Sequence, residues 1–394
     1  MYHIKLLNKI SKTGLARFDT GHYAVGEDVA APDAIVVRSA DCQNLAFNPE
    51  LLSIARAGAG VNNIPIDRCS EAGIVVFNTP GANANAVKEL VLCAMLLSSR
   101  DVYGGLKWAE TLAAEGEAVP KLIEKGKGAF VGPELLGKRL GVIGLGAIGL
   151  LVANAAEKLG MEVFGFDPYL SLEHAWEMSN AVHYARDLKT IYESCDYITL
   201  HLPLTDGTKG MLGAEAFGQM KPGMRLINLA RGGLVSEPDL LKAIAEGIVA
   251  CYATDFPSAA MIGKKGVLAI PHLGASTPES EENCALMAAA QTADYLENGN
   301  ITNSVNFPEL KSPKTPGISR LCVLHKNIPN MIAGVASVLA SAGLNIESMH
   351  NRSKSDYAYS GLDIVGDIPG ECAAAVAAIS GILRVRVIPR ENGG

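Results

Sequence analysis

A strand–turn–helix–strand pattern at residues 138–167 constrains this chain more than any other stretch. A short apolar run leads into glycines spaced G-x-G-x-x-G, helical spacing follows as far as Gly160, and a second apolar run ends at Asp167. Glycines at this spacing permit a tight turn, let a pyrophosphate approach the backbone, and let the helix pack close to the strand. The first turn of the helix offers unpaired N–H groups to the phosphates. The pattern therefore predicts a dinucleotide site that includes Gly144, Gly146, Ala147, Ile148 and Gly149.

Asp167 indicates which dinucleotide the site binds. It follows the glycines by about 20 residues, where a carboxylate can accept hydrogen bonds from the ribose hydroxyls of the adenosine. A carboxylate repels a 2′-phosphate, and Pro168 and Tyr169 supply no arginine to neutralise one. We therefore expect NAD rather than NADP as the cofactor. A glycine-rich turn without a ligand is the alternative that the motif alone leaves open.

The composition excludes several function classes. The chain has 394 residues, 48% of them hydrophobic, which is enough for two or three globular domains. Its net charge of −7 argues against nucleic-acid binding, which needs a basic face. No apolar run approaches the length of a membrane span, and the first residues lack the apolar core of a secretory signal. The 8 cysteines form no C-x-x-C pair and the 8 histidines show no ligand spacing, so we expect buried thiols, a cytoplasmic location and no metal.

Alternating apolar and helical stretches predict an α/β fold with two doubly wound parallel sheets, of the Rossmann or flavodoxin-like type. A long helical pattern at 85–114 should connect the two sheets, and a helix at 278–297 should return the chain to the first one. Strands are expected at 4–7, 34–38, 54–57 and 74–78 in the first sheet, and at 140–143, 162–166, 197–200, 225–229, 249–254 and 267–270 in the second.

A smaller unit of order β-α-β-β-α-β follows, which is the ferredoxin-like arrangement. It contains no evident catalytic cluster, so binding or assembly is its expected role. The expected domains are 1–95 with 283–305 for substrate binding, 96–282 for the nucleotide, 306–316 as a proline-rich linker, and 317–394 for the smaller unit.

Polar clusters follow three strands of the first sheet, at residues 38–39, 56–63 and 78–83. Ligands in such sheets bind beyond the carboxyl ends of the strands, so these clusters should share one edge. Arg38 and Arg56, with several amides, favour an anion pocket there, although ordinary turns have a similar composition.

Two motifs in the second sheet point to chemistry. Residues 228–233 read N-L-A-R-G-G and residues 271–277 read P-H-L-G-A-S-T, each directly after a strand. The fork of donors on Arg231 can clamp a carboxylate and an adjacent carbonyl. The imidazole of His272 can take and return a hydroxyl proton while hydride moves to the cofactor. A lone histidine is more often structural, but its combination with Arg231 and the glycine motif favours catalysis.

On these motifs the chain resembles the D-2-hydroxyacid dehydrogenase family over nearly its whole length. The last 75 or so residues resemble an ACT regulatory domain, through H-K-N-I-P-N at 325–330 and G-L-N-I at 343–346. The resemblance implies NAD-dependent oxidation of D-3-phosphoglycerate at C2, which opens serine biosynthesis, in a homodimer or homotetramer. It also implies L-serine as an effector, held between paired domains by His325, Asn327 and Asn345.

The resemblance assigns roles to individual residues. Arg231 would orient the substrate carboxylate and carbonyl, His272 would accept the proton, and Asp255 would lie near the carboxamide of NAD. The other implied contacts to the cofactor are Gly144, Gly146, Ala147, Ile148, Gly149, Asp167, Leu202, Pro203, Ala230, Gly274 and Ala275. The implied substrate ligands are Arg38, Arg56, Val61, Asn62, Asn83 and Arg231.

One segment departs from the family pattern. The family has a glutamate in a sequence like D-V-F-x-x-E-P, which pairs with the histidine and holds its tautomer. Residues 254–260 here read T-D-F-P-S-A-A, which puts Ala259 on or beside the glutamate position. Asp255 could replace the missing acid, Glu279 could do so, or His272 could work unpaired.

Two other functions remain open from the sequence. Reduction of hydroxypyruvate or glyoxylate would use the same machinery without a phosphate, and should tolerate the loss of Arg38 or Arg56. An NAD-sensing regulatory protein on the same fold, like the corepressors of the family, would need no acid beside the histidine. The presence of both Arg231 and His272 argues against the sensor.

Overall fold

The computed structural model describes residues 1–313 and 315–390, and the chain divides into two compact units. One unit is Met1–Asn83 with Pro278–Gly394, and the other is Ala84–Thr277. These divisions differ from the expected ones after residues 95 and 282. The first difference arises because helix α3 (Ala84–Ser99) buries Val91 and Met95 in the core of the nucleotide unit. The second arises because the helix that returns to the first unit begins at Pro278.

The first unit begins with a five-stranded parallel sheet of order β2-β1-β3-β4-β5, the flavodoxin-like order. The four expected strands are present, and β2 is an additional edge strand of only four residues. Helix α11 (Pro278–Asn298) returns to this sheet as expected and packs on it through small side chains such as Ala285 and Ala289. The other elements are β1 (Tyr2–Leu7), α1 (Lys12–Leu15), β2 (Tyr23–Gly26), β3 (Ala34–Val37), β4 (Ser53–Arg56), α2 (Ile66–Glu71) and β5 (Val75–Phe77).

The second unit contains a seven-stranded parallel sheet of order β12-β11-β10-β9-β6-β7-β8. The strand order reverses between β6 and β9, and dinucleotides bind in the crevice at such a point. The strands are β6 (Arg139–Ile143), β7 (Glu162–Phe166), β8 (His183–Tyr184), β9 (Tyr197–Leu200), β10 (Met224–Asn228), β11 (Val249–Thr254) and β12 (Val267–Ala269). The helices after α3 include α6 (Ala147–Lys158), α7 (Leu172–Glu177), α8 (Leu188–Ser194), α9 (Ala214–Gln219) and α10 (Glu237–Ala245).

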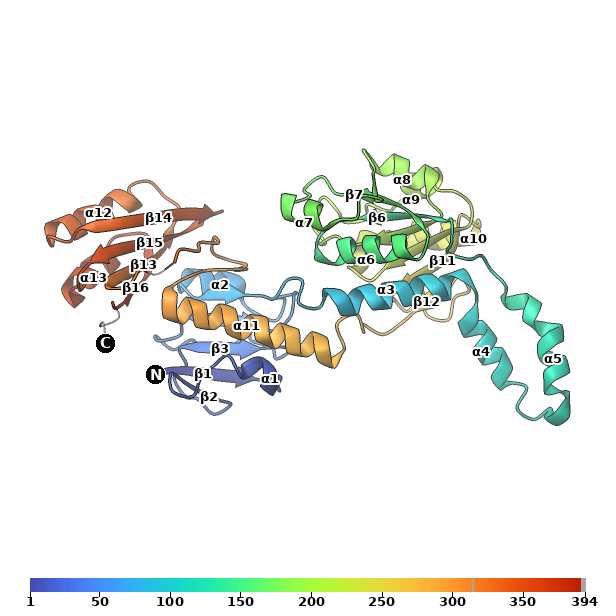
Figure 1. Ribbon diagram of the computed structural model, residues 1–394, viewed down its shortest axis with the longest axis horizontal. Helices are drawn as coiled ribbons and strands as arrows, with labels where there is room; N and C mark the ends of the chain where they lie inside the picture. Colours follow the sequence, from blue (N-terminus) through green and yellow to red (C-terminus); the bar gives the residue numbers. More distant parts are fainter. Residues whose placement is uncertain (314, 391–394) are drawn as a thin grey trace. The chain divides into compact units, whose positions relative to one another are not determined.

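The long helix expected at 85–114 is broken. Helix α3 ends at Ser99, and α4 (Val102–Glu110) begins after Asp101, whose carboxylate accepts a hydrogen bond from the N–H of Gly104 at 2.8 Å. An aspartate that caps a new helix in this way ends the previous one. Helices α4 and α5 (Val119–Gly126) form an arm that projects from the sheet of their own unit (Figure 1).

The last part of the first unit has the expected β-α-β-β-α-β order and forms an antiparallel sheet, β14-β15-β13-β16. Two helices cover one face of this sheet through a core that includes Leu321, Val335 and Leu362. Lys314 and the last four residues of the expected range 317–394 lie outside the described residues. The elements are β13 (Ile318–Lys326), α12 (Met331–Ser341), β14 (Ile346–Lys354), β15 (Tyr357–Val365), α13 (Gly370–Ala377) and β16 (Ile382–Ile388).

The other face of this sheet packs against the end of α11. Cys322 and Tyr359 share a buried core with Leu296, and the guanidinium of Arg386 donates to the carbonyl oxygens of Tyr295, at 2.7 Å, and of Leu296. The segment expected to be a linker is also packed, because Phe307 and Leu310 are buried. The two parts of the first unit therefore share one hydrophobic core.

Candidate active site

The glycine motif forms the turn between β6 and α6, and its geometry requires glycine at two positions. Gly144 has φ +94°, and a Cβ there would lie 2.5 Å from the carbonyl oxygen of His201. A Cβ on Gly149 would lie 1.9 Å from the carbonyl oxygen of Gly144. Gly146 precedes the first residue of α6, and a Cβ there would meet no atom within 4 Å. The open space over Gly146 fits a pyrophosphate at the helix N-terminus.

Asp167 follows β7 and holds the glycine turn in place. One carboxylate oxygen accepts a hydrogen bond from the N–H of Leu145, and the other accepts one from the N–H of Tyr169, both at 2.8 Å. Each oxygen of an ionised carboxylate can accept a further bond, so the side chain still offers acceptors to ribose hydroxyls.

Leu202, Pro203 and Ala230 follow β9 and β10, at the same edge of the sheet as the glycine turn. A Cβ on Gly144 would come within 3.0 Å of the Leu202 side chain, so Leu202 adjoins the turn. His201 beside them was not among the predicted site residues. Its Nε2 lies 3.0 Å from the hydroxyl of Thr199, and desolvation lowers the pKa of His201 to about 3. Burial therefore keeps the ring in its neutral form.

Arg231 is exposed on a short turn, which the buried side-chain amide of Asn228 stabilises. The side-chain oxygen of Asn228 accepts hydrogen bonds from the N–H groups of Ala230, at 3.2 Å, and Arg231, at 3.3 Å. Its Nδ2 donates to the carbonyl oxygen of Arg231 at 2.9 Å and to the hydroxyl of Tyr252 at 3.2 Å. No role was predicted for Asn228 from the motif, although an asparagine that bonds the N–H two residues on is a known turn signal.

Asp255 and His272 face each other after β11 and β12. The Asp255 side chain is 1% exposed and its Oδ2 lies 4.0 Å from Nε2 of His272, whose side chain is 66% exposed. Among the described residues neither oxygen of Asp255 has a hydrogen-bond partner. The ring of Phe256 lies against the imidazole, with the centroids 4.6 Å apart.

The electrostatics of Asp255 connect the catalytic candidates. Desolvation raises the pKa of the Asp255 carboxyl, and the charges of His272 and Arg231 oppose this rise. The backbone N–H groups of Asp255 and Gly274 also oppose it, although neither N–H reaches full hydrogen-bonding geometry. The second unit therefore gathers Arg231, His272 and Gly274 around one buried carboxylate, while Ala259 offers no acid.

The two arginines of the first unit lie side by side at the carboxyl ends of β3 and β4. Nε of Arg56 donates to the carbonyl oxygen of Arg38 at 3.2 Å, and the amide of Asn63 donates to the same oxygen at 3.4 Å. A Cβ on Gly58 would lie 2.4 Å from the Arg56 guanidinium, so glycine leaves room for that side chain. The guanidinium of Arg38 pairs with the carboxylate of Glu281 at 2.7 Å.

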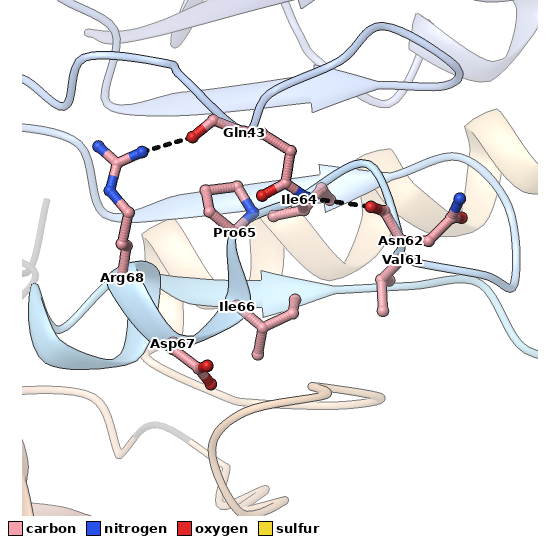
Figure 2. Close-up of a pocket in the computed structure, with 8 residues that line it drawn as sticks. All are labelled: Gln43, Val61, Asn62, Ile64, Pro65, Ile66, Asp67 and Arg68. Carbon is pink, nitrogen blue, oxygen red and sulfur yellow. Dashed lines mark hydrogen bonds between the residues drawn. The ribbon is translucent and has the colours of Figure 1, made fainter. Parts of the chain in front are cut away.

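The remaining substrate candidates are more dispersed. Val61 and Asn62 line an open hollow of about 510 Å³ beside α2 (Figure 2). Within it the Gln43 amide donates to the carbonyl oxygen of Asn62 at 3.0 Å, and the Asn62 amide points away from Arg68 (Figure 2). Asn83 directly precedes α3, at the division between the two units.

The three effector candidates do not meet within one chain. His325 is 3% exposed, with Nδ1 2.8 Å from the carbonyl oxygen of Lys326 and Nε2 3.0 Å from the hydroxyl of Ser360. Asn327 lies just beyond the same end of β13. Asn345 precedes β14. The first residue of β14 pairs with β15 at the position where β15 pairs with the start of β13, and this is the end of β13 opposite His325.

Among the described residues, no group of three or more His, Cys, Asp or Glu side chains is placed to hold a metal ion. None of the helices in the described part of the chain has the length and hydropathy that a membrane span requires.

Comparison with known proteins identifies the family of this chain. Residues 95–274 match the NAD-binding domain of the D-isomer specific 2-hydroxyacid dehydrogenases. The D-3-phosphoglycerate dehydrogenase of Escherichia coli K12 is 33% identical over 352 residues, which covers 86% of this chain and 82% of that protein. The NAD⁺-bound 3-phosphoglycerate dehydrogenase of Entamoeba histolytica superposes with a TM-score of 0.61 at 27% identity, over 78% of this chain and 99% of that one.

A D-lactate dehydrogenase of Treponema pallidum has a similar TM-score of 0.63 at 21% identity, over 77% of this chain and 99% of that one, and shows the fold alone. The glycine turn, the carboxylate after β7 and the sequence match identify the cofactor as NAD. The chain belongs to the D-isomer specific 2-hydroxyacid dehydrogenase family and is an NAD-dependent dehydrogenase.

Proposed function

We propose that this protein oxidises D-3-phosphoglycerate at C2 to 3-phosphohydroxypyruvate, the first step of serine biosynthesis. The observation that carries the proposal is the gathering of Arg231 and His272 around the buried carboxylate of Asp255, at the carboxyl edge of the NAD-binding sheet. The relatives named D-3-phosphoglycerate dehydrogenase support the choice of substrate.

Each residue of the proposed site has a separate role in the reaction. Arg231 clamps the substrate carboxylate with its fork of donors and orients the C2 hydroxyl. His272 accepts the hydroxyl proton as C2 is oxidised. The glycine turn and Asp167 would hold NAD, which would supply the acceptor for the hydride from C2. Asp255 lies 4.0 Å from the ring of His272 and stabilises the imidazolium that forms, so it replaces the glutamate that the family has near Ala259.

The arginines of the first unit supply the phosphate site in this proposal. The side chain of Arg56 donates to the backbone carbonyl of Arg38, so the two residues adjoin at one sheet edge, and their guanidinium groups are the proposed donors to the phosphoryl group. Val61, Asn62 and Asn83 remain proposed substrate contacts, although Val61 and Asn62 line a separate hollow from Arg38.

We further propose that L-serine modulates the enzyme at the C-terminal sheet. His325 and Asn327 lie at one end of that sheet and Asn345 lies at the other, so a complete site needs Asn345 from a second copy of the chain. A homodimer or homotetramer would also cover the exposed apolar side chains of the arm, such as Tyr103 and Leu106.

A cytoplasmic location is part of the proposal. The cysteines are free thiols and most of them are buried, as in proteins of reducing compartments.

A second candidate is reduction of an unphosphorylated acid such as hydroxypyruvate or glyoxylate. The ion pair of Arg38 with Glu281 favours it, because the carboxylate of Glu281 already pairs with a guanidinium proposed to bind phosphate. The catalytic residues would keep their roles in this case.

The test follows NADH absorbance with purified protein. D-3-phosphoglycerate with NAD should give turnover with a kcat/KM at least tenfold above that for a small unphosphorylated 2-hydroxy acid. Arg56→Met should raise the KM for phosphoglycerate at least tenfold and leave the unphosphorylated acid unaffected. Added L-serine should lower the rate, and the Asn345→Ala variant should escape this effect. Equal efficiency with both substrates would establish the second candidate instead.

A further inference from the structure

Glu281 lies in the first turns of α11, and its Oε1 is 2.7 Å from Nη2 of Arg38. Both side chains are partly accessible, at 37% for Arg38 and 43% for Glu281. Neither side chain is therefore buried in the core. A ligand in solution can reach this ion pair and compete for it.

The pair borders a hollow of about 910 Å³ at the edge of the first sheet. Lys9 and Lys12 line the same hollow, together with the carboxylate of Glu27. The charged lining is therefore mixed, and Glu281 is the carboxylate in it that pairs directly with an arginine.

The hollow lies where the topology of the sheet favours a ligand. It includes Leu6 and Asn8 at the end of β1 and Val25 at the end of β2, and Arg38 follows β3. The side chain of Asn8 joins the loops after β1 and β3, because its oxygen accepts a hydrogen bond from the N–H of Ser39 at 3.0 Å. In the flavodoxin-like strand order the ligand crevice opens between these two strands.

A carboxylate on the arginine acts against a phosphoryl group. Part of the guanidinium donates to Glu281, so an arriving dianion must share the remaining donors or displace the carboxylate. A carboxylate that stays bound also repels the phosphoryl charge across a few ångströms. The carboxylate of the substrate is not affected in this way, because Arg231 binds it in the proposed function.

We propose that Glu281 is a specificity-determining residue that occupies Arg38 in the free enzyme and weakens the binding of phosphorylated substrates. This inference rests on the proposed function, in which Arg38 binds the phosphoryl group. Through its pairing with Arg38, Glu281 acts in this proposal on substrate affinity and not on the chemical step.

The test compares Glu281→Gln with the wild type. Glutamine keeps the size of the side chain and removes the charge, so KM for D-3-phosphoglycerate should fall about three- to tenfold with kcat unchanged. KM for an unphosphorylated 2-hydroxy acid should stay the same. The matched control is Glu282→Gln, which removes one charge from the neighbouring position of the same helix and should leave both KM values in place.

Two results would overturn the inference. A higher KM for phosphoglycerate in Glu281→Gln would mean that Glu281 positions Arg38 for binding, and an equal fall for both substrates would mean a general charge effect. Calorimetric titration of phosphoglycerate into the enzyme–NADH complex distinguishes failure of the inference about Glu281 from failure of the proposed function. If the wild type neither binds nor oxidises phosphoglycerate, both the proposed function and the inference about Glu281 are wrong. If the wild type binds and oxidises it, the comparison with Glu281→Gln is a test of the inference about Glu281 alone.

Discussion

Replacing Asp255 by asparagine should make the enzyme slower and the protein more stable. The carboxylate is 1% exposed, lies 4.0 Å from Nε2 of His272, and has no hydrogen-bond partner among the described residues. A buried charge of this kind costs folding free energy and persists where function needs it. The amide keeps the shape of the side chain and removes the charge.

The kinetic effect follows from Coulomb's law. A full charge on His272 at 4.0 Å from the carboxylate is stabilised by about 1 kcal/mol in bulk water and about 4 kcal/mol at an effective dielectric of 20. The imidazole is 66% exposed while the carboxylate is buried, so an intermediate value of about 2 kcal/mol applies. A loss of this size lowers kcat about 30-fold. KM should change little, because Asp255 acts on the proton acceptor.

The effect on stability depends on pH in a defined direction. The pKa of Asp255 is raised in the folded state, so the folded protein holds this proton more tightly than the unfolded chain does. The destabilisation of the folded protein by the charged carboxylate is complete above the raised pKa. It declines as the pH falls through that pKa, and it vanishes below the ordinary pKa of aspartate. Asp255→Asn should therefore add about 1–3 kcal/mol at pH 8, or about 2–4 °C in Tm per kcal/mol, and nothing at low pH.

Stopped-flow NADH measurements and thermal unfolding between pH 4 and pH 9 test both effects. Glu193→Gln is the control, because it removes an exposed carboxylate of the same unit from a surface pair with Lys189 and should change neither quantity. The reasoning is refuted if Asp255→Asn keeps kcat within threefold and does not raise Tm at pH 8. A loss of kcat in Glu279→Gln instead would identify that residue as the acid.

Three further changes test other parts of the structure. Gly149→Ala places a Cβ 1.9 Å from the carbonyl oxygen of Gly144, so calorimetry should show at least a tenfold loss of NAD affinity together with a lower Tm. Asp167→Ala removes the acceptor for the ribose and the bond that holds the glycine turn, so the KM for NAD should rise about tenfold with kcat within threefold, in steady-state assays. Arg386→Met removes the buried donors at the end of α11 and should destabilise the first unit by about 2–3 kcal/mol in urea unfolding, whereas Arg390→Met at an exposed pair should not.

Local patterns explain why much of the fold could be predicted. The glycine turn, the period of each apolar run and the order of strands and helices are properties of short segments, and β7, β9 and β11 begin and end at the expected residues. The short edge strands β2 and β8 were missed, because two to four residues carry too little periodicity. The prediction of one long connecting helix was wrong, because the side chain of Asp101 caps the start of a new helix and so interrupts the helical spacing.

The sequence by itself determined the doubly wound architecture and the cofactor, and it supplied the candidates for the chemistry, because each depends on motifs of residues close together in the chain. Only the tertiary structure decided which charges are buried and which are paired. It placed Asp255, 17 residues before His272, against the ring of that histidine, and it placed Glu281 on Arg38 from a helix more than 200 residues away. Desolvation and ion pairing depend on distance in space, and the spacing of residues along the chain does not contain that distance.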